Sequence, residues 1–499
     1  MIKKAIYFPW LMTVLLLSCN PRAGSSLSAS GQPNILFIAV DDLRPETNAY
    51  GNRHMVTPHM DALASQGRLF LNHYANVPTC GPSRFTLLTG KYPQTKAQLS
   101  NAVFERLTAG RQRQALPESM VEAFRRNGYT TIGIGKISHA ADGKVYGYDQ
   151  PVSDKMELPN SWDSFLFDAG KWKTGWNAFF GYADGSNRQG RNGAVKPYES
   201  VAVDDKGYVD GLTADAAVKQ IEALKSSSSS FFLAVGFFKP HLPWNAPQKY
   251  WDLYKEDELP VSPAADLPAF VNNTGWHNSD EFNQYKKGEE RPSLEKPVSV
   301  QYARKLRHAY YASVSYVDAQ IGKVLDALKQ NGLHSNTVVV LWGDHGWHLG
   351  DQRVWGKHTL SEYALKSALI VRAPGMKKRG MATSAIVQSV DIYPTLLELA
   401  GIKQPYPLDG KSFLPLLKEP QSNTEGRAYG YFNNGITLRT NRYRITKYFR
   451  KQQPVIELYD YTNDPLETKN IAKENPEIVN RLLPLLEAGN TGLYKQQKI

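Results

Sequence analysis

Five short apolar runs, separated by helical patterns, constrain the fold of this 499-residue chain more than any other feature. Each run has five to seven residues and little polar alternation, which is typical of strands buried on both faces. Strands that alternate with helices predict an α/β fold with a large, mostly parallel sheet flanked by helices. The runs are Asn34–Val40, Thr130–Gly135, Phe231–Phe237, Thr337–Trp342 and Ser367–Val371.

Three segments between these runs have helical patterns. The first contains Pro and Glu in its first turn and is followed by Gly, which are common start and stop signals. Two further stretches, rich in Gly, Asp, Asn or Pro and without clear periodicity, predict loop-rich insertions. The helical segments are Leu116–Asn127, Gly211–Lys225 and Gln301–Gln330; the insertions are Ala140–Asp210 and Trp251–Pro297.

The pattern changes after Pro420, where several short strands follow one another and a helix ends the series. This order predicts a small antiparallel sheet with a terminal helix. We place the boundary near residue 422, so that a main domain spans 33–421 and a C-terminal subdomain spans 422–499. The predicted elements are Tyr429–Phe432, Ile436–Arg439, Tyr443–Tyr448, Glu457–Asp460 and a helix around Glu474–Ala488.

The N-terminal residues predict an export signal. Lys3 and Lys4 precede an apolar stretch, Ala5–Leu17, that is short for a membrane span. Leu-Leu-Ser-Cys19 is similar to a bacterial lipobox, whose cysteine carries a lipid; an ordinary cleaved signal peptide is the alternative. We therefore expect a signal peptide at 1–19, a tether at 20–32, and a periplasmic or cell-envelope lipoprotein of a Gram-negative bacterium. Its membrane contact would be a lipid anchor at Cys19.

The formal net charge of +12 favours an anionic partner, because a basic surface attracts anions. No zinc-finger, helix-turn-helix or RNA-binding motif is visible, so we expect no nucleic-acid partner. A sulfated or uronate-bearing glycan fits the charge equally well.

Charged or ionisable side chains follow four of the predicted strands. Ligands of open α/β sheets bind outside the carboxyl ends of the strands, so four such ends favour one convergent site over four solvated loops. The residues are Asp41 and Asp42, Lys136 and His139, Lys239 and His241, and Asp344 and His345.

The residue types at these strand ends divide into two groups. Three carboxylates, those of Asp41, Asp42 and Asp344, would repel one another without a cation, and their oxygen atoms suit calcium or magnesium. The remaining side chains can supply positive charge or protons to an anionic group, although a single His is as often a hydrogen-bonded structural residue. They are Lys136, His139, His241 and Lys357.

Cys80 is one of only two cysteines, and it has no disulfide partner if Cys19 is lipidated. Pro82 suits the first turn of a helix that continues to Gly90. Cys80 would then lie at a helix N-terminus, which favours an anion. A thiol nucleophile and an inert core residue remain alternatives, but neither explains the acidic cluster.

Cys80-Gly-Pro-Ser-Arg84 resembles the type I sulfatase signature Cys-x-Pro-Ser-Arg, which is a highly specific motif. Asn34–Asp42 is similar to that family's first strand with its metal-binding aspartates, and Thr57–Ala64 is similar to the helix that follows. Glu457–Asp460 and Asp464–Asn470 resemble its C-terminal subdomain. The resemblance covers nearly the whole mature chain and implies the alkaline-phosphatase-like sulfatase fold.

Within the family, the resemblance is strongest to the iduronate-2-sulfatase group. Gly135–His139 is similar to its Gly-Lys-x-x-His motif, and Lys239–Pro243 to its Lys-Pro-His-x-Pro motif. Asp344–Gly350, followed by Lys357, is similar to its Asp-His-Gly-Trp-x-Leu-Gly motif. Many arylsulfatases carry Asn where His345 stands.

This resemblance implies that a formylglycine-generating or anaerobic sulfatase-maturing enzyme oxidises Cys80 to formylglycine, whose hydrated aldehyde attacks sulfur. Arg84 and Lys136 would hold that group, His139 would act as the base that restores the aldehyde, and His241 would protonate the departing sugar oxygen. Lys136, His241 and Lys357 would bind the sulfate. One Ca²⁺ would be held by Asp41, Asp42, Cys80, Asp344 and His345.

The implied substrate is a sulfated oligosaccharide, with the 2-O-sulfate of an iduronate or unsaturated uronate in glycosaminoglycan breakdown as the leading candidate. Another sulfated polysaccharide, such as an algal glycan, is the alternative. A phosphate-ester hydrolase of the alkaline phosphatase superfamily is disfavoured by the Cys80 motif, because those enzymes use Ser or Thr. A non-catalytic glycan-binding lipoprotein has no need of a nucleophile motif.

Overall fold

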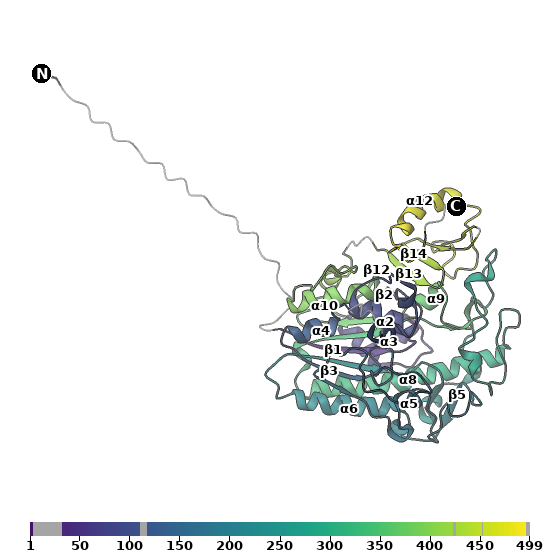
Figure 1. Ribbon diagram of the computed structural model, residues 1–499, viewed down its shortest axis with the longest axis horizontal. Helices are drawn as coiled ribbons and strands as arrows, with labels where there is room; N and C mark the ends of the chain where they lie inside the picture. The colour runs from purple at the N-terminus through teal and green to yellow at the C-terminus, as the bar shows by residue number, and fades with distance from the viewer. Residues whose placement is uncertain (3–31, 110–116, 423–425, 452, 496–499) are drawn as a thin grey trace.

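The computed structural model describes residues 1–2, 32–109, 117–422, 426–451 and 453–495 (Figure 1). The predicted signal peptide from residue 3 onward, the lipobox Cys19 and nearly all of the tether lie outside these described residues. In the described part, no helix is long and apolar enough to span a membrane. Export and lipidation therefore stay predictions.

A mixed sheet of eight strands forms the centre of the molecule, which confirms the predicted α/β class. Strands β1, β3, β6 and β8 match four of the predicted runs, and β1 pairs in parallel with β6 on one side and with β8 on the other. In spatial order the strands are β12 (Ala382–Gln388), β2 (Arg68–Tyr74), β11 (Leu369–Arg372), β8 (Thr337–Gly343), β1 (Asn34–Val40), β6 (Phe231–Phe237), β3 (Thr130–Gly135) and β4 (Ser164–Leu166).

The fifth predicted strand, Ser367–Val371, is present, but its predicted parallel direction is wrong. It corresponds to β11, which runs antiparallel to both β8 and β2. Parallel neighbours need a crossover connection of a dozen or more residues, usually a helix. Between β8 and β11 the longest helix is α9 (Glu362–Leu365), which is a single turn. Strands β2, β4 and β12 were not predicted.

Helices cover both faces of the sheet, as Figure 1 shows for α6 and α8 on one side and α4 and α10 on the other. Alternate residues of β1 therefore enter two separate cores: Leu36 packs on the α6 and α8 side, and Phe37 packs on the α4 and α10 side. The larger helices are α1 (Pro58–Gln66), α2 (Cys80–Thr89), α4 (Met120–Arg126), α6 (Val209–Leu224), α8 (Val300–Gln330) and α10 (Ile392–Ala400).

Helix α4 begins later than the sequence predicts. Its N-cap is Ser119, whose hydroxyl accepts a hydrogen bond from the Glu122 amide at 3.0 Å, while the Glu122 carboxylate reaches back to the Ser119 amide. This capping box satisfies two amides of the first turn. Pro117 and Glu118 consequently precede the helix, and the predicted first residue lies outside the described part.

The two predicted insertions are largely irregular and contain only short elements. Strand β5 of the first insertion pairs with β7, which directly follows the His241 turn. The short elements inside and outside the insertions are α3 (Val103–Ala109), α5 (Gly175–Phe179), β5 (Tyr198–Val201), β7 (Trp244–Pro247), α7 (Gln248–Trp251), β9 (His348–Leu349), β10 (Trp355–Gly356) and α11 (Leu414–Lys418).

The predicted C-terminal antiparallel sheet and helix are present, and they lie beside the end of β2 and the segment before α2 (Figure 1). The Tyr431 amide donates to the Asn76 carbonyl at 2.8 Å, and Val77 packs in the same apolar cluster as Tyr431. The domain boundary near residue 422 stays a prediction. The elements are β13 (Ala428–Phe432), β14 (Gly435–Arg439), β15 (Tyr443–Tyr448), β16 (Val455–Asp460) and α12 (Pro476–Glu487).

Candidate active site

The carboxyl ends of β8, β1, β6 and β3 are adjacent in the sheet, and the chemically active side chains follow them as the sequence predicts. Strands β3 and β6 approach closely at this edge, where Gly135 faces Gly236. Gly135 has a φ of 72°, and a Cβ there would lie 2.3 Å from the Gly236 carbonyl oxygen. Glycine therefore lets the chain turn at this point and direct Lys136 into the site.

Asp41 and Asp42 follow β1 and are fully buried. Asp42 adopts a left-handed backbone conformation with a φ of 58°, which non-glycine residues rarely adopt. Its amide donates a hydrogen bond to Asp344 Oδ1 at 2.9 Å. The strained turn therefore links the end of β1 to the end of β8 and brings the predicted carboxylates together.

Two cations lie beside the Asp41 carboxylate. Lys136 Nζ donates to Asp41 Oδ2 at 2.5 Å, and Arg84 donates to Asp41 Oδ1 at 3.2 Å. Burial alone would raise the pKa of Asp41, but Lys136 and Arg84 hold it well below its ordinary value. Arg84 also donates to Asp344 Oδ2 at 3.0 Å, so it bridges two of the three carboxylates.

Asp42 is less well compensated than Asp41. Lys357 Nζ lies 2.9 Å from Asp42 Oδ1, and His345 Nε2 lies 3.4 Å from the same oxygen. Burial nevertheless raises the pKa of Asp42 well above its ordinary value, and the charge of Lys357 offsets this only in part. We call Asp41, Asp42 and Asp344, with the Arg84, Lys136 and Lys357 cations around them, the strand-end cluster.

This donor set fits a hard divalent cation. Oxygen atoms of Asp41, Asp42 and Asp344 lie within 4.8 Å of one another, and all three residues are buried. Carboxylate oxygens at such spacing are the ligands that calcium prefers. Cys80 and His345 form a similar group with Asp42, while His241, predicted to bind substrate, groups with Asp41 and Cys80.

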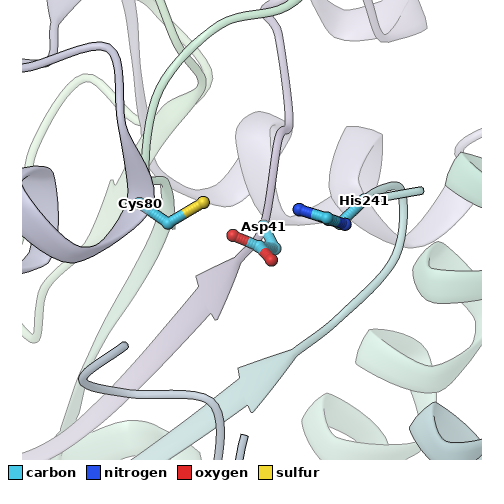
Figure 2. A group of neighbouring side chains, drawn as sticks. All are labelled: Asp41, Cys80 and His241. Carbon is cyan, nitrogen blue, oxygen red and sulfur yellow. The ribbon is translucent and has the colours of Figure 1, made fainter. Parts of the chain in front are cut away.

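Cys80 opens helix α2, as predicted, and is 2% exposed. Its sulfur lies 3.2 Å from Lys357 Nζ and 3.4 Å from His345 Nε2. Figure 2 shows the Asp41 carboxylate between the Cys80 sulfur and the His241 ring. Burial and then the Asp41 carboxylate raise the pKa of the Cys80 thiol to about 12. The unmodified thiol is therefore protonated at neutral pH and is a poor nucleophile.

Both predicted catalytic histidines are buried close to this cluster. His241 Nε2 lies 3.0 Å from Glu281 Oε1, and His241 Nδ1 lies 2.7 Å from the Leu242 carbonyl oxygen. Burial lowers the pKa of His241 to about 4, and burial lowers that of His139 well below its ordinary value. The imidazoles are thus neutral at neutral pH, and an anionic substrate group beside them would raise both pKa values.

Lys239, which also follows β6, does not reach the strand-end cluster. Its Nζ donates to the carbonyl oxygens of His241 at 3.1 Å and Pro243 at 2.5 Å. Lys239 therefore holds the turn that carries the His241 ring.

Two charged residues near the site were not singled out by the sequence prediction, and both come from the irregular insertions. Glu281 contacts His241 at 3.0 Å and Lys357 at 3.4 Å. Arg188 is 6% exposed, and its guanidinium lies 3.8 Å above the centre of the Phe180 ring. Neither residue follows a strand or belongs to a recognisable motif, so no local signal distinguished it from other charged loop residues.

The eight-stranded mixed sheet flanked by helices, together with the small C-terminal antiparallel sheet, forms the alkaline-phosphatase-like fold that the sequence predicts. Residues 33–402 match the model of the sulfatase family. Residues 343–488 match the model described as the C-terminal part of N-sulphoglucosamine sulphohydrolase. The chain therefore belongs to the sulfatase family, whose members are sulfuric ester hydrolases that act on sulfated substrates.

Individual relatives support this assignment. A sulfatase of Formosa agariphila is 30% identical over 97% of this chain and 93% of its own length. Human iduronate 2-sulfatase is 29% identical over 79% of this chain and 74% of its own length. Among solved structures, a protein in complex with its substrate D-glucosamine-2-N,6-O-disulfate superposes with a TM-score of 0.68 at 22% identity. That match covers 93% of this chain and 98% of the other and supports the fold.

Proposed function

We propose that this sulfatase removes the 2-O-sulfate of an iduronate or an unsaturated uronate during glycosaminoglycan breakdown. The similarity to human iduronate 2-sulfatase extends over 79% of the chain. The side chains quoted for that group's motifs, including His139, His241 and His345, lie around one buried centre. A 2-sulfated uronate carries two anionic groups, the sulfate and the carboxylate, and the site must offer cations to both.

The observation that carries the uronate assignment is Arg188. It is buried, and no carboxylate of the described residues forms an ion pair with it. A buried charge is costly unless an opposite charge approaches it. The Phe180 ring below its guanidinium lies 6.3 Å from the His241 ring, centre to centre. We infer that Arg188 binds the uronate carboxylate while Lys136 and Lys357 bind the sulfate.

The protein groups around Cys80 have distinct tasks in this proposal. Lys357, 3.2 Å from the Cys80 sulfur, neutralises charge on the sulfate. His241 donates a proton to the departing sugar oxygen once the anionic substrate has raised its pKa. His139 removes a proton in the second half of the cycle, and Arg84 holds Asp41 and Asp344 in place.

Two groups that the family implies would complete the site. Formylglycine, made from Cys80 by a maturation enzyme, supplies a nucleophile in place of a thiol that is protonated at neutral pH. Calcium, held by Asp41, Asp42, Asp344, His345 and the modified Cys80, supplies a Lewis acid.

The test is sulfate release from a panel of defined disaccharides by protein co-produced with a maturation enzyme and verified by peptide mass at Cys80. The panel contains 2-O-sulfated uronates, 4- and 6-O-sulfated hexosamines and sulfated algal oligosaccharides. We expect release from the 2-O-sulfated uronates alone. Release from another member of the panel only would overturn the proposed substrate but retain the sulfatase chemistry. No release from any member by fully converted protein would favour a glycan-binding role.

A further inference from the structure

A buried carboxylate outside the strand-end cluster lies under the turn that carries His241. Asp210 belongs to the first turn of α6 and is fully buried. Its Oδ1 accepts a hydrogen bond from the Phe238 amide at 2.8 Å, and its Oδ2 accepts one from the Lys239 amide at 2.9 Å. We propose that Asp210 is a positioning residue that fixes the His241 ring for proton donation, because it fastens the chain directly after β6 to the start of α6. The task of His241 is taken from the proposed function.

The His241 turn has few backbone groups with which to hold itself. Strand β6 ends at Phe237, and Pro240 and Pro243 have no N–H group to donate. The turn is closed by the His241 amide, which donates to the Phe238 carbonyl at 2.9 Å. Phe238 is the residue whose own amide is bound by Asp210. The place of the His241 backbone therefore depends on Phe238, and the place of Phe238 depends on the Asp210 carboxylate.

Lys239 connects Asp210 to the far side of the same turn. Its amide donates to Asp210, and its Nζ donates to the carbonyl oxygens of His241 at 3.1 Å and Pro243 at 2.5 Å. Burial lowers the pKa of Lys239 to about 8, and the charge of Asp210 is the largest of the charges that oppose this shift. Because the Asp210 carboxylate also favours the protonated form of Lys239, its loss should loosen both sides of the turn.

The His241 ring has little freedom to move without losing its contacts. Its Nε2 lies 3.0 Å from Glu281 Oε1 and 3.8 Å from Asp42 Oδ2, and its centre lies 4.5 Å from that of the Phe179 ring. Figure 2 shows the ring directed toward the Asp41 carboxylate. A proton donor must come within about 2.6–3.2 Å of the atom that it protonates, and a misplacement of about 1 Å can cost about 100-fold in rate. A loosened turn should therefore lower turnover even though His241 itself is present.

Asp318 provides a matched control away from the active centre. Its carboxylate is also buried and also accepts two backbone amides, from His59 at 3.1 Å and from Met60 at 2.7 Å. These amides belong to the first turn of α1, which carries none of the residues placed in the active centre. Asp318→Asn should therefore lower the stability of the protein, as Asp210→Asn should, but leave turnover per folded molecule unchanged.

The first test is a double-variant cycle on the panel substrate that the enzyme hydrolyses, with rates expressed per folded molecule. Asp210→Asn should lower kcat about 10- to 100-fold and change KM much less. In a His241→Ala background the same substitution should lower kcat by less than about twofold, because a residue that acts through His241 has nothing left to position. Lys239→Met should behave in the same way. An equal fold-loss in both backgrounds, or an equal loss in Asp318→Asn, would overturn the proposal.

The second test depends neither on turnover nor on the identity of the substrate. In protein labelled with carbon-13 at histidine Cε1, the NMR signal that is absent from His241→Ala belongs to His241. This signal should broaden or split in Asp210→Asn and stay sharp in Asp318→Asn, and a sharp, unmoved signal in Asp210→Asn would overturn the proposal. If the signal broadens but no panel substrate is hydrolysed, the proposed function fails and the positioning of His241 by Asp210 stands.

Discussion

Two buried clusters of charge in this protein differ in how completely they are satisfied. In the first, Arg444 forms a two-bonded ion pair with Glu467, with N–O distances of 2.5 and 2.6 Å. The third guanidinium nitrogen donates to the Leu360 carbonyl at 2.8 Å and to Thr446 Oγ1 at 2.9 Å. Every charged group of this pair has partners within the protein.

The strand-end cluster is built differently. Three carboxylates lie within 4.8 Å of one another at one sheet edge, and the pKa of Asp42 is raised because burial outweighs the charge of Lys357. A sulfur atom and two neutral imidazoles lie beside them. The Arg444–Glu467 pair joins the C-terminal sheet to the catalytic loops, whereas in the strand-end cluster the burial of Asp42 is only partly offset by the cations of the protein. Loss of a charge should therefore lower stability in the Arg444–Glu467 pair, whereas in the strand-end cluster it should lower activity without lowering stability.

The largest effect is expected for Asp42→Asn. Sulfate release should fall by about 10³-fold or more, because a group that positions charge at the reacting centre is lost. In chelator, the unfolding temperature should not fall, because one buried carboxylate of a repelling set has been neutralised. Calcium should raise the unfolding temperature of the wild type and should raise that of Asp42→Asn much less. A large loss of stability in chelator would place Asp42 with the structural charges.

Glu467→Gln should lower the stability of the protein and leave its turnover unchanged, which is the opposite of the result expected for Asp42→Asn. Removing one partner of a buried ion pair typically costs about 3–5 kcal/mol of unfolding free energy. The turnover per folded molecule at low temperature should remain that of the wild type, since neither Arg444 nor Glu467 contacts the active centre. Chemical denaturation and sulfate release on the same preparation check this. The double variant Arg444→Met with Glu467→Leu should recover much of the lost stability; failure to recover would show that the pair's neighbours, not its charges, set the cost.

Arg188 represents a third situation, a buried cation with no carboxylate partner among the residues that the structure describes. Arg188→Met should raise KM for a 2-O-sulfated uronate by roughly 10- to 100-fold, since a charged hydrogen bond contributes about 1.5–3 kcal/mol. The value of kcat should change much less. Arg188→Lys keeps the charge and should recover part of the affinity. An equal change of KM for a sulfated hexosamine without a carboxylate would contradict the assigned role.

The smallest effect is expected for Glu281→Gln, which keeps the shape of the side chain. Glu281 holds His241 at 3.0 Å and Lys357 at 3.4 Å. We expect kcat/KM to fall about tenfold or less, because the amide introduced by Glu281→Gln can still hydrogen-bond His241, so that only about 0.5–1.5 kcal/mol is lost. The basic limb of the pH profile of kcat should move to lower pH, because His241 acts in its protonated form and the neighbouring carboxylate favours that form. If the activity falls but the pH profile does not move, Glu281 has a purely structural role.

The sequence predicted which side chains converge at this edge of the sheet, but it did not single out the charged residues of the surrounding loops. Asp41, Lys136, His241 and Asp344 were found because each follows a buried strand, and a sheet with adjacent parallel strands brings their carboxyl ends together. Cys80 was found through a contiguous motif. These signals are local along the chain.

The missed parts have no local signal. Glu281 and Arg188 lie in irregular loops whose course depends on long-range packing. Strand β11 was identified, but its direction was not, because direction depends on the length of the connection from β8 and not on the apolar run itself. Strands β2 and β12 pair with each other across more than 300 residues of chain, so neither run indicates its partner.

In the proposed reaction Cys80, once converted to formylglycine, is the nucleophile of a sulfate ester hydrolase. The most direct measurement plots the rate of sulfate release against the fraction of converted Cys80, obtained by peptide mass, for preparations made with different amounts of maturation enzyme. We expect a straight line through the origin, with Cys80→Ala folded and inactive. Sulfate release by fully unconverted protein, or by Cys80→Ala, at the rate of the converted enzyme would contradict it.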